Sequence, residues 1–242
     1  MRTSTHGDNL IQLTNFFPAN SYLVREADGF TLIDTGISGG ATKILAAAEQ
    51  FGAPIRRIAL THVHIDHIGS LDALRAKLPE IEIAVPEREA RFLRGDMTLD
   101  PDEPQVKLAG GWQVCTTTPT RLLKAGDRVG SLEVIASPGH TPGHVAFFDH
   151  RDGSLIAGDA YSTQAGISTA GMLRVLFPFT AMATWHKPTA LRSAQALVQW
   201  QPTRLATGHG DVLTEPIPAM QRAIAEAQRY LERNANVSQK AY

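Results

Sequence analysis

The residues most able to do chemistry lie in a histidine-rich stretch at residues 61–69. Six consecutive positions there hold three imidazoles and one carboxylate, namely His62, His64, Asp66 and His67. A short apolar run at 57–60 comes directly before them and is typical of a buried strand. Because alternate side chains of an extended chain share one face, we expect His62 and His64 to point the same way.

A helical pattern follows this stretch, with Leu71, Leu74 and Leu78 spaced for one face. This pattern places Asp66 and His67 on the turn between the strand and the helix. Two imidazoles can hold one zinc ion, and a carboxylate with another imidazole can offer oxygen and nitrogen to a second. The alternative is a polar turn that happens to be rich in histidine. The cost of burying imidazoles without partners argues against it.

Three further residues of ligand type follow predicted strands, each after a glycine. They are His140 after the strand 132–137, Asp159 after 154–157, and His209 after 204–206. A glycine lets the backbone turn sharply and leaves the next side chain at the carboxyl end of its strand. We therefore expect four strand ends to converge on one edge of a two-sheet core, which is a common location for sites.

The elements that position these residues come in two similar halves. The first half predicts an antiparallel meander and then helices that alternate with strands, at 10–17, 21–25, 30–33, 41–51, 57–60, 71–78, 81–85 and 87–93. The second half predicts a comparable series, at 128–137, 145–149, 154–157, 188–200, 204–206 and 218–232. Such a repeat favours an α/β (α+β) fold, a four-layer αββα sandwich of two mixed β-sheets flanked by helices. We predict one domain over residues 1–242.

Two stretches carry no clear periodicity or are unusually apolar for connections. Residues 96–120 show no period, and long irregular insertions of this kind are often functional loops. Residues 171–182 are apolar, and we expect Met172, Phe177 and Phe179 to line an apolar wall beside the metals. The alternative is that this segment packs on the sandwich or forms a subunit contact.

The spaced ligand set resembles that of the metallo-β-lactamase superfamily. The resemblance runs from about residue 10 to 212, and its motifs are His62-x-His64-x-Asp66-His67, His140 within residues 137–144, Gly158-Asp159, Gly208-His209-Gly210 and Asp34-Thr35-Gly36. It implies that one metal is held by His62, His64 and His140, and the other by Asp66, His67 and His209. It also implies that Asp159 bridges the two metals and that Asp34 orients a ligand imidazole.

The leading hypothesis is a dinuclear zinc-dependent hydrolase that uses a metal-bridging hydroxide to cleave a small ester, lactone or thioester. Two Zn²⁺ ions suit the ligand set, and iron or manganese would fit too. Asp66 is the candidate that passes a proton to the leaving group. Tyr161, two residues after Asp159, is a candidate hydrogen-bond donor to a substrate carbonyl. Lactonases of this superfamily have a tyrosine close after the corresponding aspartate, but one position further on, so this chain departs from their pattern here.

Other functions stay open. Within the hydrolases they are a β-lactamase, which is usually exported, and a glyoxalase II-like thioesterase, which has a larger helical region after the last histidine. An iron-dependent persulfide dioxygenase would be an oxidoreductase. A non-catalytic binding protein is hard to reconcile with a complete ligand set, because such relatives usually lose ligands.

The composition limits the kinds of molecule that the protein is expected to bind. The formal net charge is −1 over 242 residues, which gives no electrostatic footprint for nucleic acid or an anionic membrane. Residues 1–9 lack the layout of a secretory signal, and no run has the length of a membrane span, so we expect a cytoplasmic protein. The single cysteine, Cys115, excludes an internal disulfide. The expected partner is a small-molecule substrate, with a homodimer possible.

Overall fold

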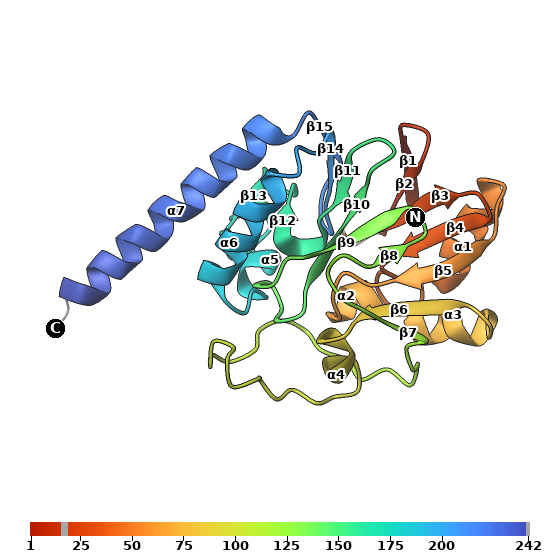
Figure 1. Cartoon of the computed structure of the whole chain (residues 1–242), viewed down its shortest axis with the longest axis horizontal. Coiled ribbons are helices and arrows are strands. Elements are labelled where there is room, and N and C mark those ends of the chain that lie inside the picture. The colour runs from red at the N-terminus through yellow and green to blue at the C-terminus, as the bar shows by residue number, and fades with distance from the viewer. Residues whose placement is uncertain (16–18, 241–242) are drawn as a thin grey trace.

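The computed structural model describes residues 1–15 and 19–240, with side chains described as far as residue 235. Two large β-sheets pack face to face, and helices cover their outer faces (Figure 1). The predicted strand 10–17 corresponds to β2 (Leu10–Thr14), and its predicted end at residues 16–17 lies outside the described residues.

The first sheet has seven strands and runs in chain order from β1 to β7. Besides β2, its strands are β1 (Arg2–His6), β3 (Asn20–Glu26), β4 (Gly29–Ile33), β5 (Ile55–Ala59), β6 (Glu82–Pro86) and β7 (Arg121–Leu123). Pairs from β1 to β4 are antiparallel, and pairs from β4 to β7 are parallel. The carboxyl ends of β4, β5 and β6 therefore meet at one edge of the sheet.

The second sheet has six strands in the order β15-β14-β11-β10-β9-β8. Their bounds are β8 (Arg128–Val129), β9 (Leu132–Ala136), β10 (Val145–Asp149), β11 (Ser154–Ile156), β14 (Arg204–Ala206) and β15 (Leu213–Thr214). Only the pair β11–β14 is parallel among these, so this sheet is mixed like the first. A two-stranded ribbon of β12 (Tyr161–Ser162) and β13 (Ser168–Thr169) lies beside it.

Helices close both outer faces of the sandwich. On the first half they are α1 (Ala41–Gln50), α2 (Ile65–Ile68), α3 (Leu71–Lys77) and α4 (Glu89–Leu93). On the second half they are α5 (Phe179–Met182), α6 (Lys187–Val198) and α7 (Ile217–Lys240), with a 3-10 turn at Gly158–Ala160. Helix α7 continues well beyond the body of the molecule toward the C-terminus (Figure 1).

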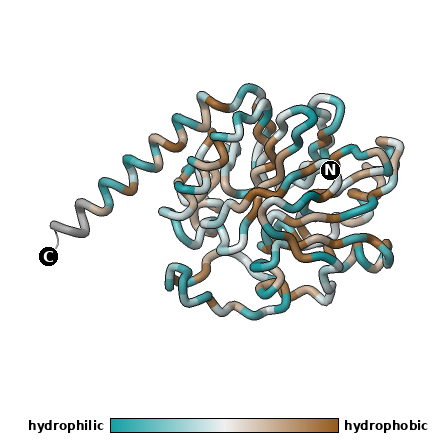
Figure 2. Tube along the Cα trace, viewed as in Figure 1, coloured by the Kyte–Doolittle hydropathy of each residue, from teal (hydrophilic) through white to brown (hydrophobic). Residues whose placement is uncertain are grey.

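Three apolar layers hold the sandwich together. The middle layer joins the two sheets through side chains such as Tyr22, Ile33 and Phe147. One outer layer packs α1, α3 and α4 on the first sheet, and the other packs α6 and α7 on the second. Figure 2 shows the apolar stretches gathered along the inner strands. The predicted αββα architecture is confirmed.

Several predicted boundaries were wrong for identifiable reasons. Residues 128–137 form a hairpin rather than one strand, because Gly130 adopts a φ of +58° and turns the chain between β8 and β9. The polar N-terminal segment forms β1, since an edge strand needs only backbone pairing with β2. None of the helices at residues 1–15 and 19–240 combines the length and apolar character needed to cross a membrane.

Candidate metal centre

The chain that leaves β5 carries the first ligands in extended conformation. As predicted, His62 and His64 point the same way, and with His140 they form a buried group whose ligand atoms lie within 4.8 Å of one another. His140 arrives from the second sheet, on the turn that follows β9. This group therefore spans the two halves of the sandwich.

The next two candidate ligands, Asp66 and His67, lie in the short helix α2 and not in an irregular turn. The amides of His67 and Ile68 both donate to the carbonyl of His64, at 2.9 and 3.1 Å, and this closes α2. A second group follows, in which ligand atoms of Asp66, His67 and His209 also lie within 4.8 Å. His209 Nε2 is 3.4 Å from Asp66 Oδ2, and His67 Nε2 is 3.9 Å from the same oxygen.

Asp159 lies between the two groups, at the end of β11. Its Oδ1 is 3.5 Å from His67 Nε2. Its Oδ2 is 3.3 Å from His140 Nε2 and 3.2 Å from His209 Nε2. One carboxylate therefore faces ligand nitrogens of both groups, which is the placement that a bridging ligand needs.

The interior of this cluster suits cations better than it suits the free side chains. His62 Nε2, His67 Nε2 and Asp159 Oδ1 are buried and have no hydrogen-bond partner among the described residues. Such orphaned polar atoms are costly unless something binds them. Nitrogen and oxygen donors at this spacing, with no thiolate, fit two divalent ions of the zinc, iron or manganese type.

Hydrogen bonds around the ligands fix which nitrogen faces the cluster. His64 Nε2 donates to the carbonyl of Ala109 at 3.1 Å, which leaves Nδ1 as a lone pair. Thr184 Oγ1 donates to the carbonyl of Thr180 and therefore accepts from His140 Nδ1 at 3.2 Å. His64 Nδ1 and His140 Nε2 then face each other as two acceptors 3.0 Å apart. A cation bound by both removes that conflict.

Asp34 contacts one of the candidate ligand imidazoles. Its carboxylate accepts from the amide and hydroxyl of Thr61, each at 2.8 Å, and from His67 Nδ1 at 2.8 Å. These contacts hold Asp34 at a φ of +58°, which is unusual for a residue with a side chain. They orient the His67 ring so that Nε2 points to the cluster.

His144 and Gly208 shape the surroundings of the bridging carboxylate. His144 Nε2 accepts from the backbone amide of Asp159 at 3.0 Å, so it supports the ligand and is not one itself. Gly208 lies so close to Asp159 Oδ1 and to His67 that a Cβ there would collide with both.

Burial and charge set the protonation of the cluster without metal. Burial lowers the pKa of His67, but the carboxylates of Asp159, Asp34 and Asp66 outweigh it and raise that pKa to about 9. Burial lowers the pKa of His64 to about 4. Burial tends to raise the pKa of the Asp66 carboxyl, but the nearby His67 and His209 lower it by more. The pKa of Asp66 therefore lies below its ordinary value. Metal binding must displace the proton of His67.

Tyr161 and Cys115 lie outside the ligand cluster and do not line the cavity. Tyr161 is fully buried in the layer between the second sheet and α6, where its hydroxyl donates to the carbonyl of Ala194 at 2.8 Å. Its predicted role as a donor to substrate was wrong, because that hydroxyl faces the outer core. Cys115 is buried, and burial raises the pKa of its thiol to about 11, which leaves little of the reactive thiolate at neutral pH.

Sequence reasoning missed Glu89, which joins two ligand loops. This fully buried carboxylate of α4 accepts from the amide of Val63 at 3.0 Å and from that of Gly143 at 2.8 Å. Those amides belong to the loops that carry His62 and His140. A signal existed in the sequence, since Glu89 shares the apolar helix face of Phe92 and Leu93.

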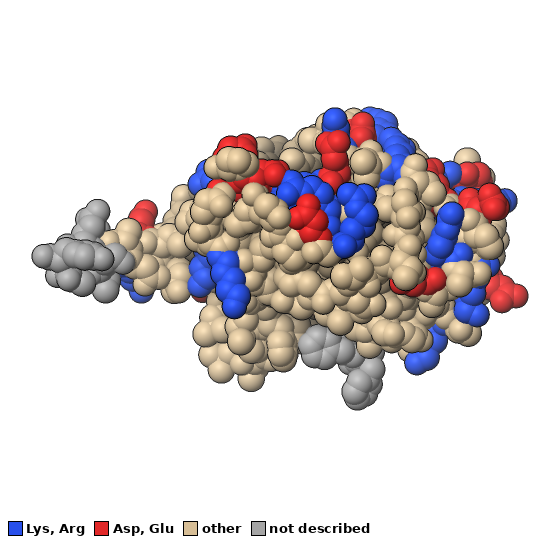
Figure 3. Space-filling view, turned by 90° about the horizontal axis from the view of Figure 1, so that it is seen from below, with Lys and Arg blue, Asp and Glu red and all other residues tan. Residues whose placement is uncertain are grey.

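A cavity of about 510 Å³ opens onto the cluster. Its lining is Ile37, His64, Ile65, Asp66, Gly110, Gly111, His140, Asp159, Phe179, Thr180, Met182, Ala183 and His209. These described residues include no lysine or arginine. Basic and acidic side chains on the face seen in Figure 3 occur in scattered groups beside a wide uncharged area.

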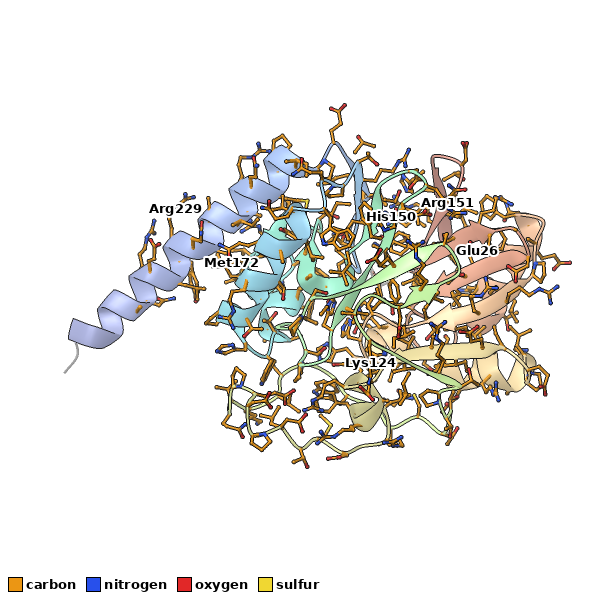
Figure 4. All side chains as sticks on the ribbon, in the orientation of Figure 1. Glu26, Lys124, His150, Arg151, Met172 and Arg229 are labelled. Carbon is orange, nitrogen blue, oxygen red and sulfur yellow. The ribbon has the colours of Figure 1, made fainter. Side chains whose placement is uncertain are left out.

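The predicted apolar wall is present in part. Phe179 lines the cavity, whereas Phe177 is buried behind it, with its ring 5.0 Å from that of His209. Met172 does not line the cavity; it follows Gly171, which lies against Lys187 of α6 (Figure 4). The other apolar side chains of the lining, which the sequence did not single out, are Ile37, Ile65, Met182 and Ala183.

Comparison with known proteins agrees with this geometry. The metallo-beta-lactamase superfamily profile matches residues 14–209. The uncharacterized protein YobT of Bacillus subtilis is 45% identical over 222 residues, covering 90% of this chain and 95% of YobT. The probable metallo-hydrolase YflN of the same organism is 30% identical and covers 81% and 82%. The crystal structure of TTHA1623 in a di-iron-bound form superposes with a TM-score of 0.62 at 26% identity, covering 86% and 96%. The chain belongs to the metallo-β-lactamase superfamily.

Proposed function

We propose that the protein is a dinuclear metal-dependent hydrolase of small, uncharged esters, lactones or thioesters. The observation that carries this proposal is the convergence of seven candidate ligand side chains from both sheets, with Asp159 in contact with ligand nitrogens of both groups. Zinc is the proposed metal. Iron is the alternative, because the similar structure of TTHA1623 is of a di-iron-bound form. Two such ions, when bound, supply an activated water and a Lewis acid for the substrate carbonyl.

The residues of the chain divide the remaining work. Asp159 contacts both ligand groups and keeps them close together, and Asp34 fixes the orientation of the His67 ring. Asp66 is the ligand carboxylate that substrate can reach, because its side chain is 23% exposed while that of Asp159 is 3% exposed. Asp66 also lines the cavity, so we assign it the transfer of a proton to the leaving group.

The absence of lysine and arginine among the described cavity-lining residues bears on the choice between the hydrolase alternatives. β-Lactams and glutathione thioesters carry carboxylates besides the reacting carbonyl, and a cationic side chain in the cavity would add to the charge of the proposed metals in offsetting the cost of desolvating those carboxylates. None of the described lining residues is a lysine or arginine. These observations favour neutral esters and lactones.

Metal analysis combined with a substrate panel tests the proposal. Protein purified without chelator should contain close to two equivalents of metal, and reloading with Zn²⁺ should restore hydrolysis of aryl esters or lactones after chelation. β-Lactams and glutathione thioesters should be turned over more slowly. A single equivalent of iron, with activity that consumes dioxygen on persulfides, would instead identify an oxidoreductase and overturn the hydrolase assignment.

A further inference from the structure

An unusually apolar, solvent-exposed segment borders the cavity. Among the described residues, ten large apolar side chains are exposed, and five of them fall within residues 173–182. These five, which we call the apolar lip, are Leu173, Val175, Leu176, Phe179 and Met182, with exposures from 51% to 87%. Single exposed apolar residues are ordinary, but a gathered patch marks a surface that binds something.

The lip is held in place by the fold. Arg174 pairs with Glu226 of α7 through contacts of 2.8 and 2.7 Å, and it also donates to the carbonyl of Ile167. Phe177 is buried beneath the lip, with its ring 5.2 Å from that of Phe179 and 5.0 Å from that of His209. The exposed side chains are therefore presented from a fixed base that touches a metal ligand.

The lip continues directly into the candidate metal centre. Phe179 and Met182 are exposed and also line the cavity, together with the ligands His140, Asp159 and His209. The cavity lining also includes Ile37 and Ile65, and Ile65 is itself 44% exposed. A molecule whose reacting group lies at the ligands must extend its substituent across this apolar surface.

We infer that the apolar lip binds the alkyl part of the substrate, so that the proposed hydrolase acts on uncharged acyl compounds with a medium or long carbon chain. This inference rests on the proposed function. A reacting carbonyl near Asp66 and Asp159 directs its acyl chain past Phe179 and Met182 to solvent-exposed Leu173, Val175 and Leu176. Each methylene that leaves water for this surface should raise kcat/KM by up to about fourfold.

A homologous series of p-nitrophenyl esters, from acetate to decanoate, tests the inference on metal-loaded protein. Within each protein the readout is the ratio of kcat/KM between neighbouring chain lengths. For the wild type we expect an increase of about two- to fourfold per methylene until the chain passes the lip. In Phe179→Ser/Met182→Ser this ratio should fall close to one. Val114→Ser removes an exposed apolar side chain outside the cavity lining and should keep the wild-type ratio.

Two further measurements separate the possible failures. Calorimetric binding of 1-alkanols of increasing length reports on the lip even if no ester is turned over, so loss of the proposed function is distinguishable from loss of the inference. Light scattering reports the oligomeric state of the same variants. A chain-length ratio that is unchanged in the double variant would overturn the inference. So would a double variant that only converts a dimer to a monomer, because the lip would then be a contact between copies.

Discussion

At the scale of single residues, the centre is a set of buried polar side chains that contact one another and the residues around them. Asp159 has contacts to ligand nitrogens of both groups and is 2% exposed. Its backbone amide is fixed by His144, and Gly208 leaves room for its carboxylate. Removing one member of such a network leaves the others buried and unpartnered.

Asp159→Ala should lose most of the bound metal and most activity while the fold survives. The carboxylate stands at a strand end rather than in an apolar layer, and two ligand groups lose their shared oxygen donor. Metal content by elemental analysis and far-UV circular dichroism are the measurements. His150→Ala is a matched control, because that imidazole lies in an exposed turn between β10 and β11 (Figure 4). Retention of two metals by Asp159→Ala would show that another residue bridges the ions.

Glu89 should give the metal-free protein a specific pH dependence. Burial raises its pKa from the ordinary value of 4.5 to about 7. The folded state then binds a proton that the unfolded state releases, so this contribution to stability is complete below pH 4.5 and is lost as pH rises through about 7. The full change is on the order of 3 kcal/mol.

Urea unfolding of the metal-free protein and of Glu89→Gln at several pH values measures this effect. The variant should be destabilised by about 1–3 kcal/mol at low pH, because one acceptor oxygen for a loop amide is lost. The difference between the two proteins should shrink as pH approaches 7. Glu87→Gln, an exposed carboxylate that precedes α4, provides the control. A difference that does not vary with pH would show that Glu89 does not titrate in this range.

At the scale of elements, the sequence predicts the regular parts of the centre and misses the irregular ones. Three sequence features predicted that the candidate ligands meet at one edge of the two-sheet core. They are the spacing of the ligands, the strand–glycine–ligand pattern and the alternation of strands and helices. Residues 96–120 offered no period, yet they form an ordered loop. Arg88 binds Glu103 in this loop through two contacts, and Asp72 of α3 accepts from the amides of Thr116 and Thr117.

The irregular loop supplies the support of His64, and no local pattern could reveal it. The carbonyl of Ala109 accepts from both His64 Nε2 and the indole of Trp112, whose ring is 4.5 Å from that of His64. These contacts join residues about 45 positions apart through a backbone oxygen, which any residue type provides. Side-chain chemistry therefore predicts the ligands, whereas the backbone groups that orient them become known only from the fold.

Gly110→Ala should weaken the metal group formed by His62, His64 and His140. Gly110 has a φ of +93°, and an added Cβ would collide with the imidazole of His64. Displacing an oriented ligand typically lowers metal affinity by roughly 10- to 100-fold, which a competition titration with a chromogenic chelator measures. In Gly126→Ala the backbone strain is similar, since φ is +88°, but open space surrounds the position. Equal losses of affinity in both variants would mean that strain alone is responsible.

At the scale of the whole molecule, the centre connects the two halves of the sandwich. His62, His64, Asp66 and His67 follow the first sheet, whereas His140, Asp159 and His209 follow strands of the second. Bound metal thus links two layers that otherwise meet through the apolar layer between the sheets. A ligand that binds only the folded state stabilises it by mass action, by about 4 kcal/mol at a thousandfold excess over its dissociation constant.

Metal loading should therefore raise the unfolding temperature by on the order of 10 °C for a chain of this length. The size of the rise should depend on pH. In the metal-free protein the pKa of His67 is raised to about 9, so protonation of His67 stabilises that form fully below its ordinary pKa of 6.5, and this stabilisation is lost as pH rises through about 9. The bound metal needs the unprotonated ring and keeps its contribution. Calorimetric scans with and without Zn²⁺ should show a difference that widens between pH 6.5 and 9. The difference should be nearly absent in Asp159→Ala, and an equal difference at all pH values would show that metal binding displaces no proton from this cluster.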